Sequence, residues 1–282
     1  MKQDNPKSDG KVFTKEEIVE QLRQLGAPQD GIVLIHTALR QIGKVEGGGQ
    51  CLLDTFIEYF TAKGGLFCVP THTPGNMLAK NLEIALDMAD NGHDLGAFTT
   101  IALEDKRGIR SENPILSMKV FGDREKAQAF IYDDAFITSP TAPESCYGKL
   151  ATQNGHILLV GVGQDKSTYL HSVAELLNLP DRMDTNFRTT KVKRLNGECV
   201  ERKLRLYHCS KTKDISPRFV LYEPAFRHLG GTRDGYIGNA KVQLCDAKRI
   251  KEIVALIFKN AKGEDPLGTW DPIPPAWYCA EE

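Results

Sequence analysis

The sequence lacks a long apolar run, a strong net charge and any regular spacing of cysteines. Without a stretch of about 18 apolar residues, it offers no candidate for a membrane span. Residues 1–17 contain no apolar core of a secretory signal, so we expect a cytoplasmic protein. The net charge of −1 argues against binding nucleic acid through a general basic field.

The seven cysteines are scattered, and none forms a CxxC pair. Such a set is typical of reduced thiols rather than of a disulfide framework or a zinc site. The histidines show no HxH or HExxH spacing, so we expect no bound metal. A metal-dependent hydrolase that uses His36, His72, His171 and Asp165 remains an alternative that a metal assay decides.

What the sequence does contain suits a single α/β domain over residues 1–282. Hydrophobic residues make up 41% and charged residues 26%, which is enough for both a sizeable core and a soluble surface. Residues 1–12 are polar, and we expect a flexible start there. The tail at 264–282 is rich in proline and aromatic residues, so we expect it to dock on the chain's own surface or on a partner subunit. The chain is therefore expected to be a monomer or a homodimer.

Three short apolar runs, at 31–35, 66–69 and 157–160, predict buried strands. Helices are predicted between them, first after Thr14, which forms a capping-box pattern with Glu17, and then at 52–60. This βαβ order favours parallel neighbours. Each strand ends in a polar or glycine-containing turn: His36-Thr37, Thr71-His72 and Gly161–Asp165. If the strands are parallel, these ends share one cleft.

The second half of the chain gives mixed signals. The pattern predicts helices at 82–89, 123–130 and 246–259, and a strand at 242–244. Residues 187–195 and 200–209 alternate around Asn196-Gly197, which predicts an antiparallel hairpin.

The stretch 155–178 joins a strand, a glycine turn and a helix that Ser167 or Thr168 is expected to cap. Leu170, Val173, Ala174 and Leu177 form its apolar stripe. His171 and Glu175 are four residues apart, so their side chains are neighbours beside the core. The pair is either a catalytic base with its carboxylate or an ordinary helix-surface pair. The glycines at 47–49 are similarly ambiguous, because they favour either an anion-binding backbone or a flexible turn.

Five segments in order resemble the aminoglycoside 3-N-acetyltransferase family. The first, 36–48, is similar to the family's HSSLxxxGxVxGG pattern, and 69–73 is similar to MPTxT. The third, 110–117, is similar to RSxHPxxS. Ser139-Pro140 with Gly148-Lys149-Leu150 is similar to SPxGKL, and 158–175 to LLLGVGxDxxTxxHLAE. The likeness runs from about residue 14 to about residue 259.

The resemblance implies an α/β fold, a three-layer α/β/α sandwich with a mostly parallel central sheet and an antiparallel C-terminal portion, unlike GCN5-type acetyltransferases. It also implies direct transfer of an acetyl group from acetyl-CoA to the 3-amino group of a 2-deoxystreptamine antibiotic, which confers resistance. The alternative is an acetyl-CoA-dependent N-acetyltransferase of this fold that acts on a different amine.

Acetyl transfer to an amine needs a base, and His171 suits that role because an imidazole titrates near neutral pH. By resemblance, Glu175 and Asp165 belong to the site, and either one is expected to orient the His171 ring. Thr71 is expected to donate to the developing oxyanion or, alternatively, to satisfy local backbone.

By the same resemblance, acetyl-CoA is expected to contact two loops and a polar segment: His36, Thr37, Ala38, Leu39, Gly43, Val45, Gly47, Gly48, Arg110, Ser111 and Ser117. Two of these residues also have a structural interpretation. Arg110 is alternatively part of an ion pair, and His36 a satisfied strand-end histidine.

The sequence departs from the family pattern in two places. Glu112-Asn113 stands before Pro114, and Ala38 replaces a hydroxyl residue. A polycationic acceptor needs acidic residues around it, and the acids available for this are Asp87, Asp90, Asp94, Asp133 and Asp134. Two further classes fit less well. Gly161 and Gly163 lack the third glycine of a dinucleotide-binding oxidoreductase, and a non-catalytic relative would have lost the base.

Overall fold

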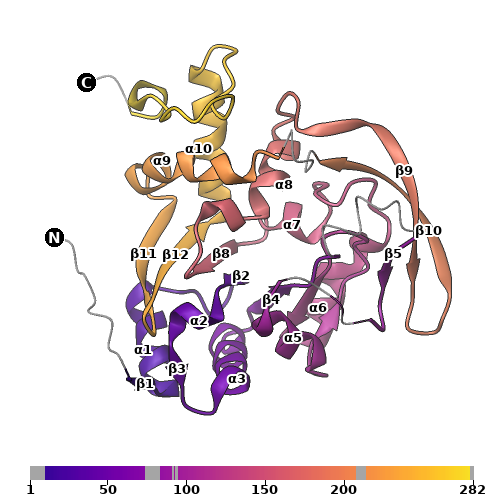
Figure 1. The fold of residues 1–282 in the computed structure, drawn as a ribbon, viewed down its shortest axis with the longest axis vertical. Coiled ribbons are helices and arrows are strands. Elements are labelled where there is room, and N and C mark those ends of the chain that lie inside the picture. The colour runs from indigo at the N-terminus through magenta and orange to yellow at the C-terminus, as the bar shows by residue number, and fades with distance from the viewer. Residues whose placement is uncertain (1–9, 74–82, 91, 93–94, 208–213, 280–282) are drawn as a thin grey trace.

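The computed structural model describes residues 10–73, 83–90, 92, 95–207 and 214–279. Its centre is a seven-stranded mixed sheet (Figure 1). The strand order is β11 (Thr232–Ile237), β12 (Ala240–Asp246), β8 (Gly155–Val160), β2 (Ile32–Thr37), β4 (Leu66–Pro70), β7 (Met118–Phe121) and β6 (Ile109–Arg110).

The three predicted strands are parallel neighbours at the centre of this sheet. β2 pairs in parallel with β8 on one side and with β4 on the other. The prediction of a mostly parallel sheet is wrong, because all outer pairings are antiparallel. β11 and β12 form a tight hairpin, and β7 and β6 bring the chain back beside β4. Antiparallel strands need no crossover helix, so β11–β12 and β6–β7 are each joined by a short connection, whereas other elements lie between β4 and β6 and between β8 and β11.

Helices pack on both faces of the sheet because side chains alternate along each central strand. In β2, Ile32 and Leu34 join one apolar core, and Val33 and Ile35 join the other. The core with Val33 includes side chains of α1 (Lys15–Leu25), α3 (Gly48–Thr61) and α5 (Ala97–Glu104). The core with Ile32 includes side chains of α6 (Arg124–Ile131), α7 (Cys146–Lys149), α8 (Tyr169–Leu176), α9 (Glu223–His228) and α10 (Ala247–Asn260).

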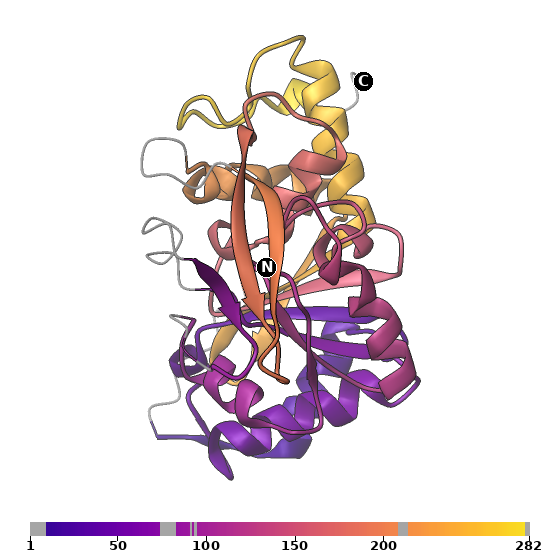
Figure 2. The same ribbon diagram turned by 90° about the vertical axis from the view of Figure 1, so that its right-hand side faces the viewer.

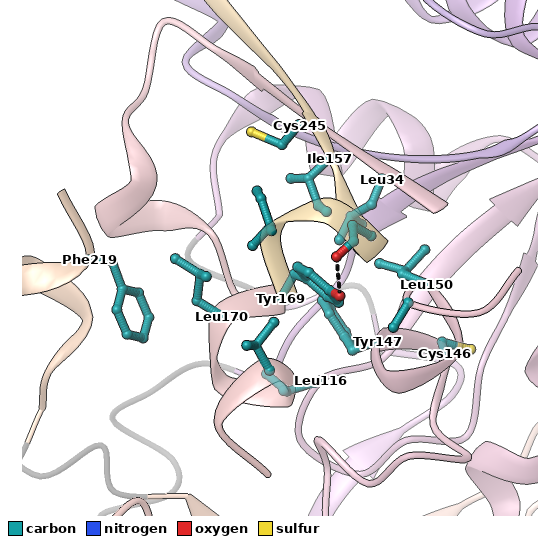
Figure 3. Close-up of a cluster of buried hydrophobic side chains, with 14 of the residues drawn as sticks. Leu34, Leu116, Cys146, Tyr147, Leu150, Ile157, Tyr169, Leu170, Phe219 and Cys245 are labelled. Carbon is teal, nitrogen blue, oxygen red and sulfur yellow. Dashed lines mark hydrogen bonds between the residues drawn. The ribbon is translucent and has the colours of Figure 1, made fainter. Parts of the chain in front are cut away.

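The core with Ile32 also fixes α8 and α10 relative to each other. Tyr169 on α8 is fully buried, and its hydroxyl donates to the carbonyl oxygen of Ala247 at 2.7 Å (Figure 3). A phenol in an apolar core needs such a partner, so this bond sets the position of the first turn of α8.

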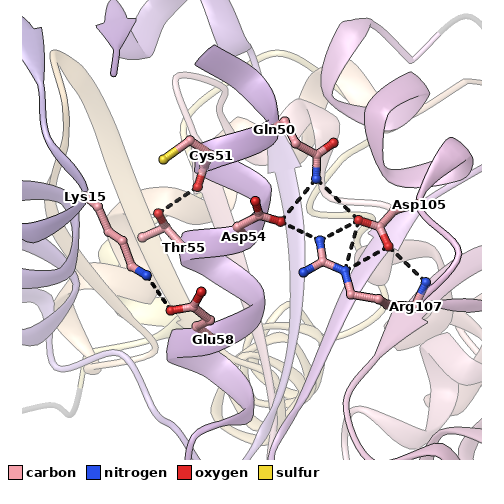
Figure 4. A network of polar contacts seen from close by, with 8 residues as sticks. All are labelled: Lys15, Gln50, Cys51, Asp54, Thr55, Glu58, Asp105 and Arg107. Atoms are coloured by element: carbon pink, nitrogen blue, oxygen red, sulfur yellow. Dashed lines mark hydrogen bonds and ion pairs between the residues drawn. The ribbon is translucent and has the colours of Figure 1, made fainter. Parts of the chain in front are cut away.

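On the opposite face, ion pairs connect the helices at the surface. Lys15 on α1 pairs with Glu58 on α3, and Arg107 bridges Asp54 of α3 and Asp105 (Figure 4). Apart from Asp105, whose side chain is mostly buried, these groups are substantially exposed to solvent, where an ion pair contributes about 0–1 kcal/mol. The apolar cores, rather than this network, therefore hold the helices in place.

The ends of two helices test the predicted caps. At α1, Thr14 and Glu17 form the capping box, and Gly26 ends the helix in the left-handed conformation, as predicted. At α8 the predicted cap is wrong: Thr168 has helical backbone angles and its side chain makes no capping bond. The short 3-10 turn η2 (Gln164–Lys166) leads into this helix instead.

A smaller sheet contains β10 (Cys199–Tyr207), β9 (Met183–Lys193) and β5 (Ile84–Asp87). β9 and β10 form the predicted hairpin around Asn196-Gly197, which Figure 2 shows as a long ribbon along one side of the molecule. The helix predicted at 82–89 is wrong, because residues 84–87 pair with β9. Four residues form more backbone hydrogen bonds by pairing with the edge of β9 than in one isolated turn of helix, whose nucleation is costly.

The described part of the tail docks on the chain's own surface, the first of the two expected locations. Leu267, Ile273 and Tyr278 are buried, and Asn260 at the end of α10 donates to the carbonyl oxygen of Trp277 at 3.0 Å. Within the described ranges, no helix combines the length and apolarity that crossing a membrane requires. Residues 1–9, most of the predicted flexible start, lie outside those ranges.

The shorter elements complete the chain. They are β1 (Val12–Phe13), α2 (Leu39–Ile42), β3 (Lys44–Val45), η1 (Tyr132–Ala135), η3 (Ser216–Tyr222) and η4 (Pro275–Trp277). β1 and β3 pair in parallel beside α3. Of these elements, η3 matters most for the site because it begins at Ser216.

Candidate active site

A cavity of about 450 Å³ opens where the central parallel strands end. His36 and Thr37 line it from the end of β2, Pro70 from the end of β4, and Asp165 from the turn after β8. This location confirms that the three strand ends share one cleft, as is typical of open α/β sheets. The rest of the lining consists of Ile35, Val69, His72, Leu95, Phe98, Thr99, Val162, Lys166, Thr168, His171, Tyr207, Asp214 and Ser216.

His171 lies in this cavity on the first turn of α8 and is only 7% exposed. Its ring stacks on Tyr207 with 4.2 Å between ring centroids, and it meets the Phe219 ring edge to face with 5.0 Å between centroids. Burial among these rings lowers the pKa of His171 to about 4. The imidazole is therefore neutral near pH 7 and has a lone pair that can take a proton.

The chain Asp214–Ser216–His171 decides which ring nitrogen has that lone pair. The Ser216 hydroxyl donates to Asp214 Oδ1 at 2.6 Å, and Ser216 Oγ lies 3.0 Å from His171 Nε2. Because the hydroxyl proton goes to the carboxylate, Ser216 Oγ accepts from Nε2–H. In a neutral imidazole only one nitrogen is protonated, so Nδ1 is the basic atom.

The two expected carboxylates are bonded elsewhere. Glu175 accepts hydrogen bonds from the hydroxyls of Ser139 at 2.6 Å and Thr141 at 2.5 Å. Asp165 lines the cavity, and its carboxylate lies 3.1 Å from Lys166 Nζ. Among the described residues, neither one is hydrogen-bonded to His171. The structure thus brings His171 and Asp165 into one cavity, whereas Glu175, on the same helix as His171, contacts Ser139 and Thr141 and is not part of the lining.

Asp214 and Ser216 are the site residues that the sequence reasoning missed. Ser216 is 45 residues from His171 along the chain. The only local signal is the Asp-x-Ser pattern before Pro217, which is typical of a turn in which the Asp side chain accepts from backbone. Nothing in that pattern indicates a contact with α8.

Thr71 is fully buried and does not line the cavity. Its hydroxyl lies 2.9 Å from Ser117 Oγ and 3.3 Å from Arg110 Nε. The geometry favours the alternative interpretation of Thr71, in which the hydroxyl satisfies local polar groups. Its neighbour His72 lines the cavity instead.

Arg110, Ser111 and Ser117 form a polar cluster with Thr71. The Arg110 guanidinium donates to the carbonyl oxygens of Thr71 at 3.0 Å and Asp90 at 2.8 Å, and burial lowers its pKa to about 10. Ser117 donates to the Thr71 carbonyl oxygen at 2.6 Å, and Ser111 accepts from the Met118 N–H at 3.2 Å. These polar atoms support the end of β4, and none of the three residues lines the cavity.

The remaining residues expected to contact acetyl-CoA divide into two groups. Ala38, Leu39 and the glycine segment with Gly43, Val45, Gly47 and Gly48 are absent from the lining of the cavity, and Gly47 instead begins α3 in the left-handed conformation. His36 and Thr37 do line it. His36 Nε2 and Thr37 Oγ1 are buried without a hydrogen-bond partner among the described residues. Leaving such groups unpaired costs about 1–3 kcal/mol each, so both residues bring an unsatisfied polar atom to the wall of the cavity.

His36, His72 and His171 all line the cavity as neutral imidazoles. Burial lowers the pKa of His36 to about 4. The pKa of His72 falls to about 3 through burial and, secondarily, the nearby His36 and His171. In the part of the chain that the structure covers, no group of three or more His, Cys, Asp or Glu side chains is arranged to hold a metal ion.

Comparison with known sequences gives a consistent result. The model of a family described as aminoglycoside 3-N-acetyltransferase matches residues 34–259, most of the chain. Aminoglycoside N(3)-acetyltransferase IV of Salmonella sp. is 24% identical over 260 residues, covering 90% of this chain and 89% of that protein. Aminoglycoside N(3)-acetyltransferase VIII of Streptomyces fradiae is 26% identical over 189 residues, with coverage of 61% and 64%.

Solved structures show the same fold at low identity. The YokD protein of Bacillus subtilis aligns with a TM-score of 0.74 at 19% identity, over 90% of this chain and 96% of that chain. AAC-IIIb in binary complex with CoASH aligns with a TM-score of 0.73 at 19% identity, over 91% and 100% of the two chains.

Proposed function

Because the chain belongs to the aminoglycoside 3-N-acetyltransferase family and is an N-acetyltransferase, we propose that it transfers the acetyl group of acetyl-CoA directly to an amine, with His171 as general base. The observation that supports this most strongly is the His171 ring in the cavity at the strand ends. It is neutral, and its Nε2–H is engaged by Ser216. The arrangement leaves a basic Nδ1 for the amine proton.

The proposed reaction uses these groups in a fixed order. The amine nitrogen attacks the thioester carbonyl carbon while His171 Nδ1 takes its proton. The resulting imidazolium is stabilised through Ser216 by the negative charge of Asp214, the role that a carboxylate plays in a catalytic triad. When the carbon–sulfur bond breaks, the same proton passes to the CoA sulfur, which leaves the base neutral again. Asp165, on the wall after β8, is proposed to help position the amine.

His36 and Thr37 are proposed to hold acetyl-CoA, because their buried, unpaired polar atoms fit its amide and carbonyl groups. That the related AAC-IIIb structure contains CoASH supports this use of the fold. For the other expected contacts a supporting role is proposed: Glu175, Thr71, Arg110, Ser111 and Ser117 fix the backbone around the cavity, while Ala38, Leu39 and the loop with Gly43, Val45, Gly47 and Gly48 lie beyond it.

The family favours an aminoglycoside acceptor, acetylated at its 3-amino group, with antibiotic resistance as the consequence. A different amine is a second candidate, and a specific observation favours it. Of the acids expected around a polycation, Asp87 pairs with Lys193, Asp133 pairs with Lys149, and Asp134 is fully buried. Asp94 lies outside the described residues. The acids that line the cavity are Asp165 and Asp214, and Lys166 lies beside them.

Thiol release from acetyl-CoA tests the proposal directly. The wild type is assayed with a panel of 2-deoxystreptamine drugs and a panel of monoamines, with His171→Ala as the control. We expect release with at least one amine and none with the variant, which should still bind acetyl-CoA. Comparing thiol release with the drugs and with the monoamines identifies the class of amine that the enzyme accepts. An active His171→Ala enzyme would remove His171 as the base.

We propose a single domain that acts in the cytoplasm as a monomer or homodimer, on a three-layer α/β/α sandwich distinct from GCN5-type enzymes. The two apolar cores on opposite faces of the sheet support the layered description.

A further inference from the structure

His72 is held rigidly at the edge of the cavity by its two neighbours. The Thr71 N–H donates to the Ser117 carbonyl oxygen at 2.8 Å, and the Thr73 N–H donates to the Ile115 carbonyl oxygen at 3.0 Å. The Thr73 hydroxyl also lies 2.7 Å from the carbonyl oxygen of Pro114. The backbone on both sides of His72 is therefore fixed, so its imidazole enters the cavity from a fixed point.

The partner of His72 is Tyr147, a fully buried residue on α7. Tyr147 Oη lies 2.5 Å from His72 Nε2, and this is its hydrogen bond in the described part of the chain. Figure 3 shows Tyr147 within an apolar cluster, beside Leu116 and Leu150. If the phenol only accepted a hydrogen bond, its own proton would be buried without a partner, which costs free energy. Tyr147 therefore donates, and His72 Nε2 accepts.

This direction fixes the tautomer of His72. Burial keeps the ring neutral by lowering its pKa to about 3. A neutral imidazole whose Nε2 accepts has its single proton on Nδ1. Among the described residues, Nδ1 has no hydrogen-bond partner and is not one of the fully buried unpaired atoms, so we infer that it is accessible from the cavity that His72 lines. The cavity thus contains an N–H donor on a fixed, uncharged ring.

We propose that His72 Nδ1–H is the oxyanion donor of this enzyme: it hydrogen-bonds the thioester oxygen of acetyl-CoA as negative charge develops there. The inference rests on the proposed acetyl transfer. As the nitrogen–carbon bond forms, the carbonyl π electrons move to oxygen, and they return when the carbon–sulfur bond breaks. His72 retains its proton throughout. A neutral imidazole is suited to this role because its pKa as an acid is too high for it to lose the proton. The role expected of Thr71 therefore falls to the next residue.

A matched pair of substitutions tests the position of the donor. His72→Asn places an amide N–H near the position of Nδ1, whereas His72→Gln places its amide near Nε2, where it contacts Tyr147 and leaves the cavity without the donor. We expect His72→Gln to lower kcat about 10²-fold, the usual cost of one oxyanion donor, with little change in KM for acetyl-CoA. His72→Asn should retain most of kcat. Full activity in His72→Gln, or equal losses in both variants, would overturn the proposal.

The tautomer of His72 can be measured by NMR, independently of enzymatic activity. Long-range ¹H–¹⁵N spectra of histidine-labelled protein, assigned by the signals lost in His72→Asn, should show His72 neutral at pH 7 with the proton on Nδ1. In Tyr147→Phe, which preserves the ring volume, that preference should weaken and kcat should fall. An Nε2–H tautomer in the wild type would refute the assignment.

Failure of this inference is distinguishable from failure of the proposed function. If the wild type releases thiol with no amine, the proposed transfer is wrong. If the wild type is active and His72→Gln is equally active, only the role of His72 is wrong. Acetyl-CoA binding, followed by calorimetry in each variant, shows whether a loss of rate comes from binding or from the chemical step.

Discussion

At the scale of residues, burial determines the protonation state of His171, the proposed base. Its pKa of about 4 means that the ring is already neutral above about pH 5. The base therefore does not limit the rate between pH 6 and 8, and the rise of activity with pH comes from deprotonation of the acceptor amine. In the pH profile, titration of His171 is therefore separated from titration of the acceptor amine.

We predict that the inflection in kcat/KM moves with the pKa of the amine. Two acceptors whose amines differ by about 2 pKa units should give inflections separated by the same amount, with none common to both near pH 6.5. The measurement is kcat/KM from thiol release between pH 5.5 and 9.5. A shared inflection near pH 6.5 would show that the base titrates as an exposed histidine does.

The Asp214–Ser216–His171 chain gives a second prediction at this scale. Asp214→Asn removes the charge that stabilises the imidazolium, so kcat should fall by about 10-fold to 10²-fold while KM for acetyl-CoA stays nearly constant. Asp165→Asn is the matched comparison: it removes a carboxylate from the same cavity that has no hydrogen bond to His171, and because Asp165 is proposed to position the amine, it should act mainly on KM for the amine. A larger loss of kcat in Asp165→Asn than in Asp214→Asn would reverse the assignment of the orienting carboxylate.

His171 was predictable from sequence, whereas its partners were not. A helix after a glycine turn places residues with 3.6-residue spacing, so a histidine beside an apolar stripe is visible in the pattern. Ser216 follows the β9–β10 hairpin in the chain, 45 residues after His171, so no local sequence period connects the two residues. Glu175 was predicted as a partner from its spacing of four, but its carboxylate finds two hydroxyls nearer to it.

At the scale of elements, Glu175 joins α8 to the segment at 139–141. Its carboxylate accepts from Ser139 and Thr141, and hydrogen bonds to a charged group contribute about 1.5–3 kcal/mol each. We predict that Glu175→Gln lowers the free energy of unfolding by about 1–2 kcal/mol and leaves kcat within a few-fold of the wild type. The measurements are urea unfolding and thiol release.

Glu58→Gln is the control for that variant. It removes one carboxylate charge from an exposed ion pair with Lys15, and such a pair contributes about 0–1 kcal/mol to the free energy of unfolding (Figure 4). Unchanged unfolding of Glu175→Gln together with a loss of kcat of about 10²-fold would instead assign Glu175 to the chemistry, as the spacing on the helix predicted.

Helices and strands could be predicted from the sequence where their own residues determine their conformation. The central strands and α1 have a clear period and, for α1, a capping box and a terminal glycine. β5 was predicted as a helix because Ile84, Leu86 and their neighbours give too short a pattern to separate the two structures. Its conformation depends on pairing with β9, about a hundred residues later in the chain. Such pairings also decide the antiparallel edges of the large sheet.

At the scale of the whole molecule, the cavity makes the fold sensitive to acid. His36, His72 and His171 have pKa values of about 4, 3 and 4 in the folded protein because their rings are buried, which disfavours the charged form. In the unfolded chain they titrate near 6.5. Between these values the unfolded state binds more protons than the folded state, so stability rises with pH and is lost as the pH falls from about 6.5 toward 4.

We predict a steep fall in the free energy of unfolding between pH 6.5 and 5. Each of the three histidines contributes up to about 1.4 kcal/mol per pH unit, or about 4 kcal/mol per unit together where all are protonated in the unfolded state. Urea unfolding at pH 7, 6, 5.5 and 5 measures the slope, above the range in which most carboxylates titrate. His36→Asn removes one group and should reduce the slope by about a third. Thr99→Val, at another position in the lining, should change the free energy of unfolding equally at every pH and leave its slope against pH unchanged. If His36→Asn keeps the wild-type slope, His36 takes up a proton in the folded protein as readily as in the unfolded chain, and burial does not lower its pKa.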